Sequence, residues 1–296
     1  MAGDPLARIG SRKLEAYATS FPIGCFMDDT CPTISVMMPC CNNARYIEAA
    51  VESVLSQQID VPLELLIIDD ASSDDSVDRI KAIGDSRIRL IPNQNNCGIS
   101  RVRNQLLEAA NGRFLTSLDG DDLYVDPRKL AREWELLHTC PDPERTIVYS
   151  DVRWIDANGQ TMLQSSAIAP PMEGLLYQAI LDRRVMIPRD FMLSAELARS
   201  VGGFDVELPI YEDWDYKLRL AQKAVFRYTG SVGIGYRRHG SGLSAAAAPL
   251  HQKCQAMIRK KHGGEGSDGD PMRLLSLAGR LHGILTRNRL RDRKTA

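Results

Sequence analysis

The sequence lacks the features that mark several specialised classes of protein. Its 296 residues contain no apolar stretch of about eighteen residues, and the N-terminal region has no long apolar core. We therefore expect neither a membrane-spanning helix nor a signal peptide. The formal net charge is −1, so no overall positive field attracts nucleic acid. These absences favour a cytoplasmic protein without a nucleic-acid partner.

Cysteine and glycine are present, but not in the spacings that define common sites. The seven cysteines are an odd number, and no two have CxxC spacing. Neither a disulfide framework nor a zinc site is indicated, and a reducing compartment is expected. No GxGxxG follows the first apolar run, which argues against a dehydrogenase that binds a dinucleotide.

Hydrophobic periodicity predicts strands that alternate with helices. Short apolar runs predict strands at residues 34–38, 63–68, 87–91, 113–118 and 146–150, and amphipathic segments predict helices at 46–57, 75–83, 100–110, 127–138 and 212–224. Pro39 is expected to end the first strand, and Pro127 to lie in the first turn of its helix. This alternation implies right-handed βαβ units and a mostly parallel sheet flanked by helices.

The two ends of the chain differ from this pattern. We expect residues 1–32 to be an N-terminal extension, 33–244 the main α/β domain, and 245–296 a basic, helical C-terminal extension. Basic residues outnumber acidic ones after Pro249, and residues 272–290 carry apolar side chains on one helical face. Residues 250–296 could lie peripherally on the anionic inner face of a membrane. Packing against the domain or a second copy of the chain is the preferred alternative.

Residues 119–122 (DGDD) are the strongest chemical signal. Three carboxylates within four residues repel one another unless a cation is present. Their hard oxygen atoms suit Mg²⁺ or Mn²⁺, which bridge phosphates, and Gly120 would allow a sharp turn. Ligands of parallel sheets bind at the carboxyl ends of strands, where this cluster and Asp70 are both predicted to lie. A solvated acidic loop is the alternative. A phosphatase nucleophile is disfavoured because Leu123 replaces the required Thr or Val.

Other polar residues carry weaker signals. The carboxylate of Asp70 could bind the N–H of a nucleotide base or cap the next helix. Arg103 could grip phosphate or lie on an ordinary surface helix. Glu212 and Asp213 begin a predicted helix, where a carboxylate could act as a general base or as a cap. His239 is either a surface side chain or a metal ligand.

Six segments occur together in an order that resembles glycosyltransferase family 2, the inverting enzymes with the GT-A fold. They are ISVMMPCCNN (34–43), LIIDDASSDDS (66–76), NCGISRVRNQLLEAANG (96–112), FLTSLDGDD (114–122), GGFDVELPIYEDWD (202–215) and YRRHGSGLS (236–244). The resemblance implies a Rossmann-like GT-A catalytic domain over residues 33–244.

The resemblance also implies a role for each matching position. Pro39, Cys41 and Asn42 would line the nucleotide pocket, Asp70 would bind the base, and Arg103 would lie near the diphosphate. Asp119 would contact the ribose or sit beside the metal, Asp121 would bind Mn²⁺ or Mg²⁺ with support from Asp122, and His239 would be a further metal or diphosphate contact. Asp213 would be the catalytic base, and Glu212 would help to hold the acceptor or donor sugar.

The implied function is metal-assisted, inverting transfer of a sugar from a nucleotide-diphosphate sugar to a hydroxyl of a saccharide or glycolipid acceptor, as in polysaccharide biosynthesis. A UDP-sugar is the expected donor. Cys41, however, stands where family members often carry a tyrosine that packs on the base, which leaves another nucleotide or another stacking residue open. A sugar-nucleotidyltransferase is an alternative, although residues 39–43 lack the glycines of its usual loop. A non-catalytic saccharide-binding module would need neither the acidic cluster nor a base.

Overall fold

The computed structural model describes residues 33–239 and 248–263. The predicted N-terminal extension and the helix expected at 272–290 lie outside the described residues. The limits proposed for the three regions therefore stay predictions.

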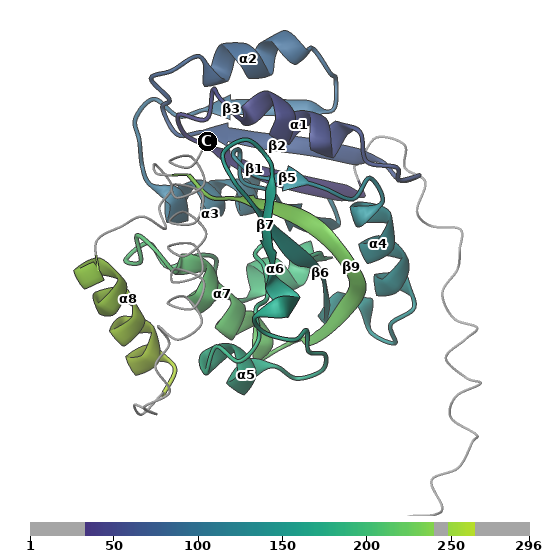
Figure 1. Ribbon diagram of the computed structural model, residues 1–296, viewed down its shortest axis with the longest axis vertical. Helices are drawn as coiled ribbons and strands as arrows, with labels where there is room; N and C mark the ends of the chain where they lie inside the picture. Colours follow the sequence, from purple (N-terminus) through teal and green to yellow (C-terminus); the bar gives the residue numbers. More distant parts are fainter. Residues whose placement is uncertain (1–32, 240–247, 264–296) are drawn as a thin grey trace, which may run out of the picture. The chain divides into compact units, whose positions relative to one another are not determined.

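A five-stranded sheet forms the centre of the described part (Figure 1). Its strands follow the order β3 (Ile88–Pro92), β2 (Leu63–Asp69), β1 (Ile34–Cys40), β4 (Phe114–Ser117) and β8 (Leu193–Ser194). The first four are parallel, and β8 pairs antiparallel with β4. The predicted mostly parallel sheet is confirmed. The expected stop at Pro39 is wrong, because Pro39 and Cys40 continue the register opposite Ile68 and Asp69. A proline close to a strand's end removes only one donor from the ladder.

Helices cover both faces of this sheet. Apolar residues of α1 (Ile47–Leu55) and α2 (Ser76–Ile83) share one core with Val36. Those of α3 (Ile99–Ala109) share the other core with Met37. Neighbouring residues of a strand point to opposite faces, so β1, which is buried along its whole length, supplies both layers.

A second, four-stranded sheet was not predicted. Its order is β5 (Leu123–Tyr124), β9 (Val225–Arg237), β6 (Thr146–Ile155) and β7 (Thr161–Gln164), with β6 and β9 parallel. Three glycines obscure the strand pattern of β9. A Cβ atom at Gly233 would lie 2.6 Å from Lys129 Cγ and 2.8 Å from Ser150 Cβ. Close packing therefore requires glycine at a position where sequence patterns predict a break.

The remaining helices connect and flank the sheets. They are α4 (Lys129–His138), α5 (Tyr177–Leu181), α6 (Ala195–Ser200), α7 (Glu212–Ala221) and α8 (Ala248–Lys261), with short 3₁₀ turns at Pro143–Arg145 and Ser165–Ala167. The helix expected from Pro127 begins at Lys129, because a turn at Asp126 precedes it. The Asp126 carbonyl accepts the Lys129 N–H at 3.0 Å, and the Asp126 carboxylate accepts the Arg128 N–H at 2.9 Å. None of the helices in the described ranges is long and apolar enough to span a bilayer.

Helix α8 falls within the predicted C-terminal extension and packs on α7. Its Cys254 and Ile258 side chains are buried in the core that contains α3 and α7. Lys261 Nζ and His262 Nε2 each lie 2.9 Å from the buried carboxylate of Asp215. Apolar burial and charge therefore both hold α8 in place. Contacts of the rest of residues 250–296 with a membrane or a second copy remain a prediction.

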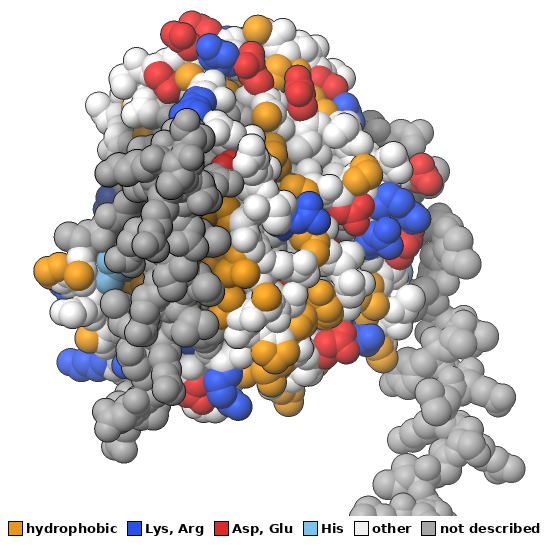
Figure 2. All heavy atoms as spheres, viewed as in Figure 1, with side chains coloured by type: hydrophobic (Ala, Val, Ile, Leu, Met, Phe, Trp, Pro, Cys, Tyr) orange, Lys and Arg blue, Asp and Glu red, His pale blue; other side chains and the backbone are white. Residues whose placement is uncertain are grey.

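Figure 2 shows acidic and basic side chains side by side over α1 and α2, where Arg79 and Glu48 form a 2.9 Å ion pair. This mixed surface agrees with the near-zero net charge.

Candidate active site

Loops from three parallel strands meet at one edge of the central sheet. The Asp70 N–H donates to Cys40 O at 2.8 Å, and the Gly120 N–H donates to Pro39 O at 3.2 Å. Gly120 does not have a positive φ. A Cβ atom there would instead lie 3.0 Å from Asn43 Oδ1 and 3.1 Å from Ile47 Cδ1. The expected turn is present, since the Asp122 N–H donates to Asp119 O at 3.0 Å, and the close approach of the loops is what requires glycine within it.

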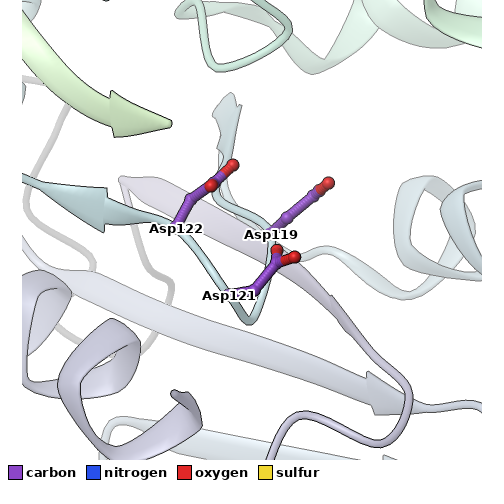
Figure 3. Close-up of side chains that lie close together, drawn as sticks. All are labelled: Asp119, Asp121 and Asp122. Carbon is purple, nitrogen blue, oxygen red and sulfur yellow. The ribbon is translucent and has the colours of Figure 1, made fainter. Parts of the chain in front are cut away.

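The three aspartates of the acidic cluster project from their loop in the same general direction (Figure 3). One oxygen of each carboxylate of Asp119, Asp121 and Asp122 lies within 4.8 Å of the others. Such crowding of negative charges is stable only when nearby positive charges offset the repulsion.

Two arginines supply part of that positive charge. Arg189 lies 2.7 Å from Asp119 Oδ2 and 2.8 Å from Asp122 Oδ2. Arg103 donates to Asp119 at 2.9 Å and to Glu212 at 3.2 Å. Burial raises the pKa of Asp119, but the charges of Arg103 and Arg189 outweigh it and hold the pKa below its usual value. The network thus links the acidic loop to the start of α7.

Asp122 and Asp121 have different surroundings. Asp122 is 1% exposed, and its second oxygen accepts the Arg237 N–H at 2.7 Å. Its carboxylate therefore fixes the acidic loop against β9. The Asp121 carboxylate receives no arginine N–H in the described part of the chain. It lies 2.7 Å from His239 Nε2, at the end of β9. The aspartate oxygen suits Mn²⁺ or Mg²⁺ when phosphate oxygens complete the coordination, and the imidazole nitrogen is a further potential metal ligand.

Helix α7 brings Glu212 and Asp213 to the same region. Its first residue follows Tyr211, whose left-handed backbone (φ 65°) turns the chain into the helix. Asp213 Oδ2 accepts from Lys217 Nζ at 2.9 Å. Burial raises the pKa of Asp213, but Lys217 and the nearby arginines outweigh it, so the net pKa lies below its usual value. Asp213 is therefore ionised at neutral pH and is able to accept a proton.

Asp70 serves a structural purpose in addition to any role in binding. Its carboxylate accepts the N–H groups of Cys97 and Gly98, each at 2.9 Å, and the side-chain amide of Asn93 at 3.0 Å. Burial raises the pKa of Asp70, yet these hydrogen bonds hold it below its ordinary value. Asp70 ties β2 to the loop before α3 rather than capping α2.

The loop after β1 is held by the loop after β2. The Asn42 N–H donates to Ser72 Oγ at 2.8 Å, and Asn42 Oδ1 accepts the Ser73 N–H at 2.8 Å. Cys41 is exposed, and its thiol lies 3.4 Å from Asn96 Nδ2. Cys41 and Asn42 therefore form a fixed rim of the site.

A cavity of about 1200 Å³ joins these groups. Every residue predicted from the sequence to belong to the site lines it except Asp122, which is buried and paired with Arg189. The lining residues from that set are Pro39, Cys41, Asn42, Asp70, Arg103, Asp119, Asp121, Glu212, Asp213 and His239.

Sequence reasoning missed Arg189 and Lys217. Arg189 lies between α5 and β8 in a segment without a clear periodic pattern, and it pairs with aspartates about seventy positions earlier in the chain. No local signal in one sequence indicates such a pairing. Lys217 follows Asp213 by four positions on one helix, a spacing typical of a helical ion pair that could have been noticed.

Comparisons with known proteins agree with this arrangement. The family profile "Glycosyl transferase family 2" matches residues 35–187, just over half of the chain. An uncharacterized glycosyltransferase of Rickettsia felis is 24% identical over 231 residues, which are 77% of this chain and 38% of the relative. The Escherichia coli UDP-Glc:alpha-D-GlcNAc-diphosphoundecaprenol beta-1,3-glucosyltransferase WfgD is 39% identical over 99 residues, 33% of this chain and 38% of that protein.

Solved structures agree on the fold. S. aureus TarS 1-349 in complex with UDP-GlcNAc matches with a TM-score of 0.60 at 18% identity, over 76% of this chain and 65% of that one. The chain spans less than two fifths of the length of the Rickettsia felis relative. The predicted GT-A fold is confirmed by this likeness, and the profile match over residues 35–187 shows that the chain belongs to glycosyl transferase family 2.

Proposed function

We propose that this protein transfers a sugar from a nucleotide-diphosphate sugar, a UDP-sugar, to a hydroxyl of a saccharide or lipid-linked acceptor, with inversion at the anomeric carbon. The observation that carries the proposal is that Asp121, His239 and Asp213 line one cavity at the carboxyl ends of the strands. The names of WfgD and of the TarS complex, which include UDP-sugars, support the choice of donor.

Each residue then has a defined task. Asp121 and His239 would hold Mg²⁺ or Mn²⁺, which when bound would offset the charge of the diphosphate leaving group. Arg103 and Arg189 keep Asp119 ionised, and Arg189 holds the buried Asp122 carboxyl group in place. The rim formed by Cys41 and Asn42, together with Asp70, would enclose the nucleotide.

The reaction is a single displacement. The acceptor oxygen forms a bond to the anomeric carbon while the bond from that carbon to the diphosphate oxygen breaks. Asp213 takes the proton of the attacking hydroxyl, and the nucleoside diphosphate leaves with the bonding electron pair. Attack from the face opposite the leaving group inverts the configuration. Glu212, fixed by Arg103, would help to position a sugar.

A donor screen tests the proposal. Purified protein is incubated with UDP-, GDP- and dTDP-sugars, with Mn²⁺, with Mg²⁺ or with chelator. We expect slow, metal-dependent release of UDP from at least one UDP-sugar, because water can replace the acceptor. Release of pyrophosphate in the presence of a nucleoside triphosphate and a sugar phosphate would instead identify a nucleotidyltransferase. Absence of nucleoside diphosphate release from every donor would count against the proposal.

A further inference from the structure

Arg183 lies just beyond α5 and lines the same cavity as the acidic cluster. Its φ is 55°, a left-handed conformation that a residue with a side chain adopts where the surrounding structure fixes it. Its N–H donates to Ile180 O at 3.1 Å. The chain thus holds the Arg183 backbone in one orientation.

Two aromatic rings fix the guanidinium group. The Arg183 Cζ atom lies 4.8 Å from the ring centroid of Tyr211 and 4.5 Å from that of Trp214. The Trp214 indole N–H donates to Ile180 O at 3.0 Å, and the Tyr211 hydroxyl lies 2.9 Å from His251 Nδ1 on α8. Both rings are therefore anchored, and the guanidinium needs little ordering to receive a ligand.

The guanidinium group of Arg183 contacts aromatic rings and no carboxylate in the part of the chain that the structure describes. Arg103 and Arg189 line the same cavity and pair with carboxylates, whereas Arg183 forms no ion pair within residues 33–239 and 248–263. Its Nη1 atom is also buried without a hydrogen-bond partner among those residues. A buried guanidinium N–H without an acceptor is unfavourable, and an anionic oxygen is the partner that best satisfies it.

The position of Arg183 identifies the molecule that would supply this oxygen. Tyr211 and Trp214 flank Glu212 and Asp213 in the sequence, so the guanidinium lies beside the first turn of α7. The proposed function, on which this inference rests, places the donor's diphosphate at the divalent cation that Asp121 and His239 would hold. We propose that Arg183 binds a phosphate or carboxylate group of the acceptor, and so selects acceptors that carry a negative charge near the attacking hydroxyl.

Binding of small anions to the UDP-loaded protein tests the inference without requiring turnover. Methyl phosphate and acetate are titrated at millimolar concentrations, by calorimetry, into full-length protein saturated with UDP and Mg²⁺. Arg183→Gln is expected to weaken binding of the preferred anion by about tenfold or more, and Arg183→Lys by less, since lysine keeps the charge but not the fork of donors. Arg184→Gln is the matched control, because Arg184 is 58% exposed and pairs with Asp182.

The outcomes separate the two anions and the two proposals. Stronger Arg183-dependent binding of methyl phosphate supports a phosphate-bearing acceptor, and stronger binding of acetate supports a carboxylate-bearing one. No anion binding to the UDP-loaded wild type, or equal affinity in wild type and both Arg183 variants, overturns the inference alone. Failure of UDP itself to bind overturns the proposed function and, with it, this inference. UDP affinity in each variant serves as the check on folding.

Discussion

At the scale of single residues, the site is a set of carboxylates whose charges are balanced in different ways. Arg103 pairs with Asp119, and Arg189 pairs with both Asp119 and Asp122. Lys217 pairs with Asp213, whereas the carboxylate of Asp121 lies beside the imidazole of His239. The four aspartates are chemically alike in the sequence, and their different partners give them different roles in the site. Two predictions concern Asp213.

Asp213→Asn is expected to lower sugar transfer by roughly 10²-fold or more, because an amide cannot take the hydroxyl proton. UDP affinity should change little, since the proposed nucleotide and metal contacts lie on other loops. Steady-state transfer and UDP titration measure the two effects. Glu196→Gln, on the exposed side of α6, is the control. Near-normal turnover in Asp213→Asn would remove Asp213 from the role of base.

Lys217→Met should shift the acid limb of the pH–activity profile to higher pH. Asp213 must be ionised to act as a base, so activity is lost as the pH falls through its pKa. Burial raises that pKa, and the charge and hydrogen bond of Lys217 do most to lower it. The wild-type limb should therefore lie below about pH 4, the usual aspartate range, and the Lys217→Met limb above it. The pH dependence of kcat/KM measures this. An unchanged limb, matching that of the exposed control Lys223→Met, would contradict the assignment.

At the scale of elements, α8 is held to α7 by a buried carboxylate. Burial raises the pKa of Asp215, but hydrogen bonds from His262 and Lys261 and the charge of Arg219 outweigh it and keep the pKa below its usual value. The stabilisation is therefore present above the unfolded pKa and is lost as the pH falls through the lower folded pKa.

Asp215→Asn is expected to lower the free energy of unfolding by about 2 kcal/mol at neutral pH, because it removes the charge of a buried carboxylate that accepts hydrogen bonds from Arg219 and His262 and pairs with Lys261. Urea unfolding measures the difference, which should shrink as the pH falls below about 4. Asp205→Asn is the control, since that carboxylate is 26% exposed and also pairs with Lys261. Its expected effect is below about 1 kcal/mol. Equal effects of the two substitutions would show that Asp215 does not anchor α8.

The elements also show where sequence reasoning succeeds. Mostly apolar runs such as that of β1 predict buried parallel strands, and Asp119 directly after a run of this kind predicts a site at the strand's end. The sequence does not predict β9, because glycine has a low strand propensity. Glycine stands at position 233 because a larger side chain would collide with Lys129 and Ser150. Propensity describes local preference, and here a tertiary contact overrides it.

At the scale of the whole molecule, the site depends on contacts between distant segments. Arg189 reaches Asp122 from 67 positions away, and His239 reaches Asp121 from 118 positions away. The motifs carrying Asp121 and His239 were recognised through the family pattern, whereas Arg189 belongs to no motif in this sequence. Family membership therefore locates the acidic loop, and the structure adds the cations that balance it.

We propose that Asp121 and His239 hold a divalent cation together with a nucleotide diphosphate. Calorimetric titration of UDP with and without Mn²⁺, on wild type and Asp121→Asn, tests it most directly. For the wild type we predict that Mn²⁺ tightens UDP binding by about tenfold or more, on the strength of cation–phosphate coordination, and that Asp121→Asn abolishes this gain. Equal UDP affinity with and without metal in the wild type, or an undiminished gain in Asp121→Asn, would contradict the claim.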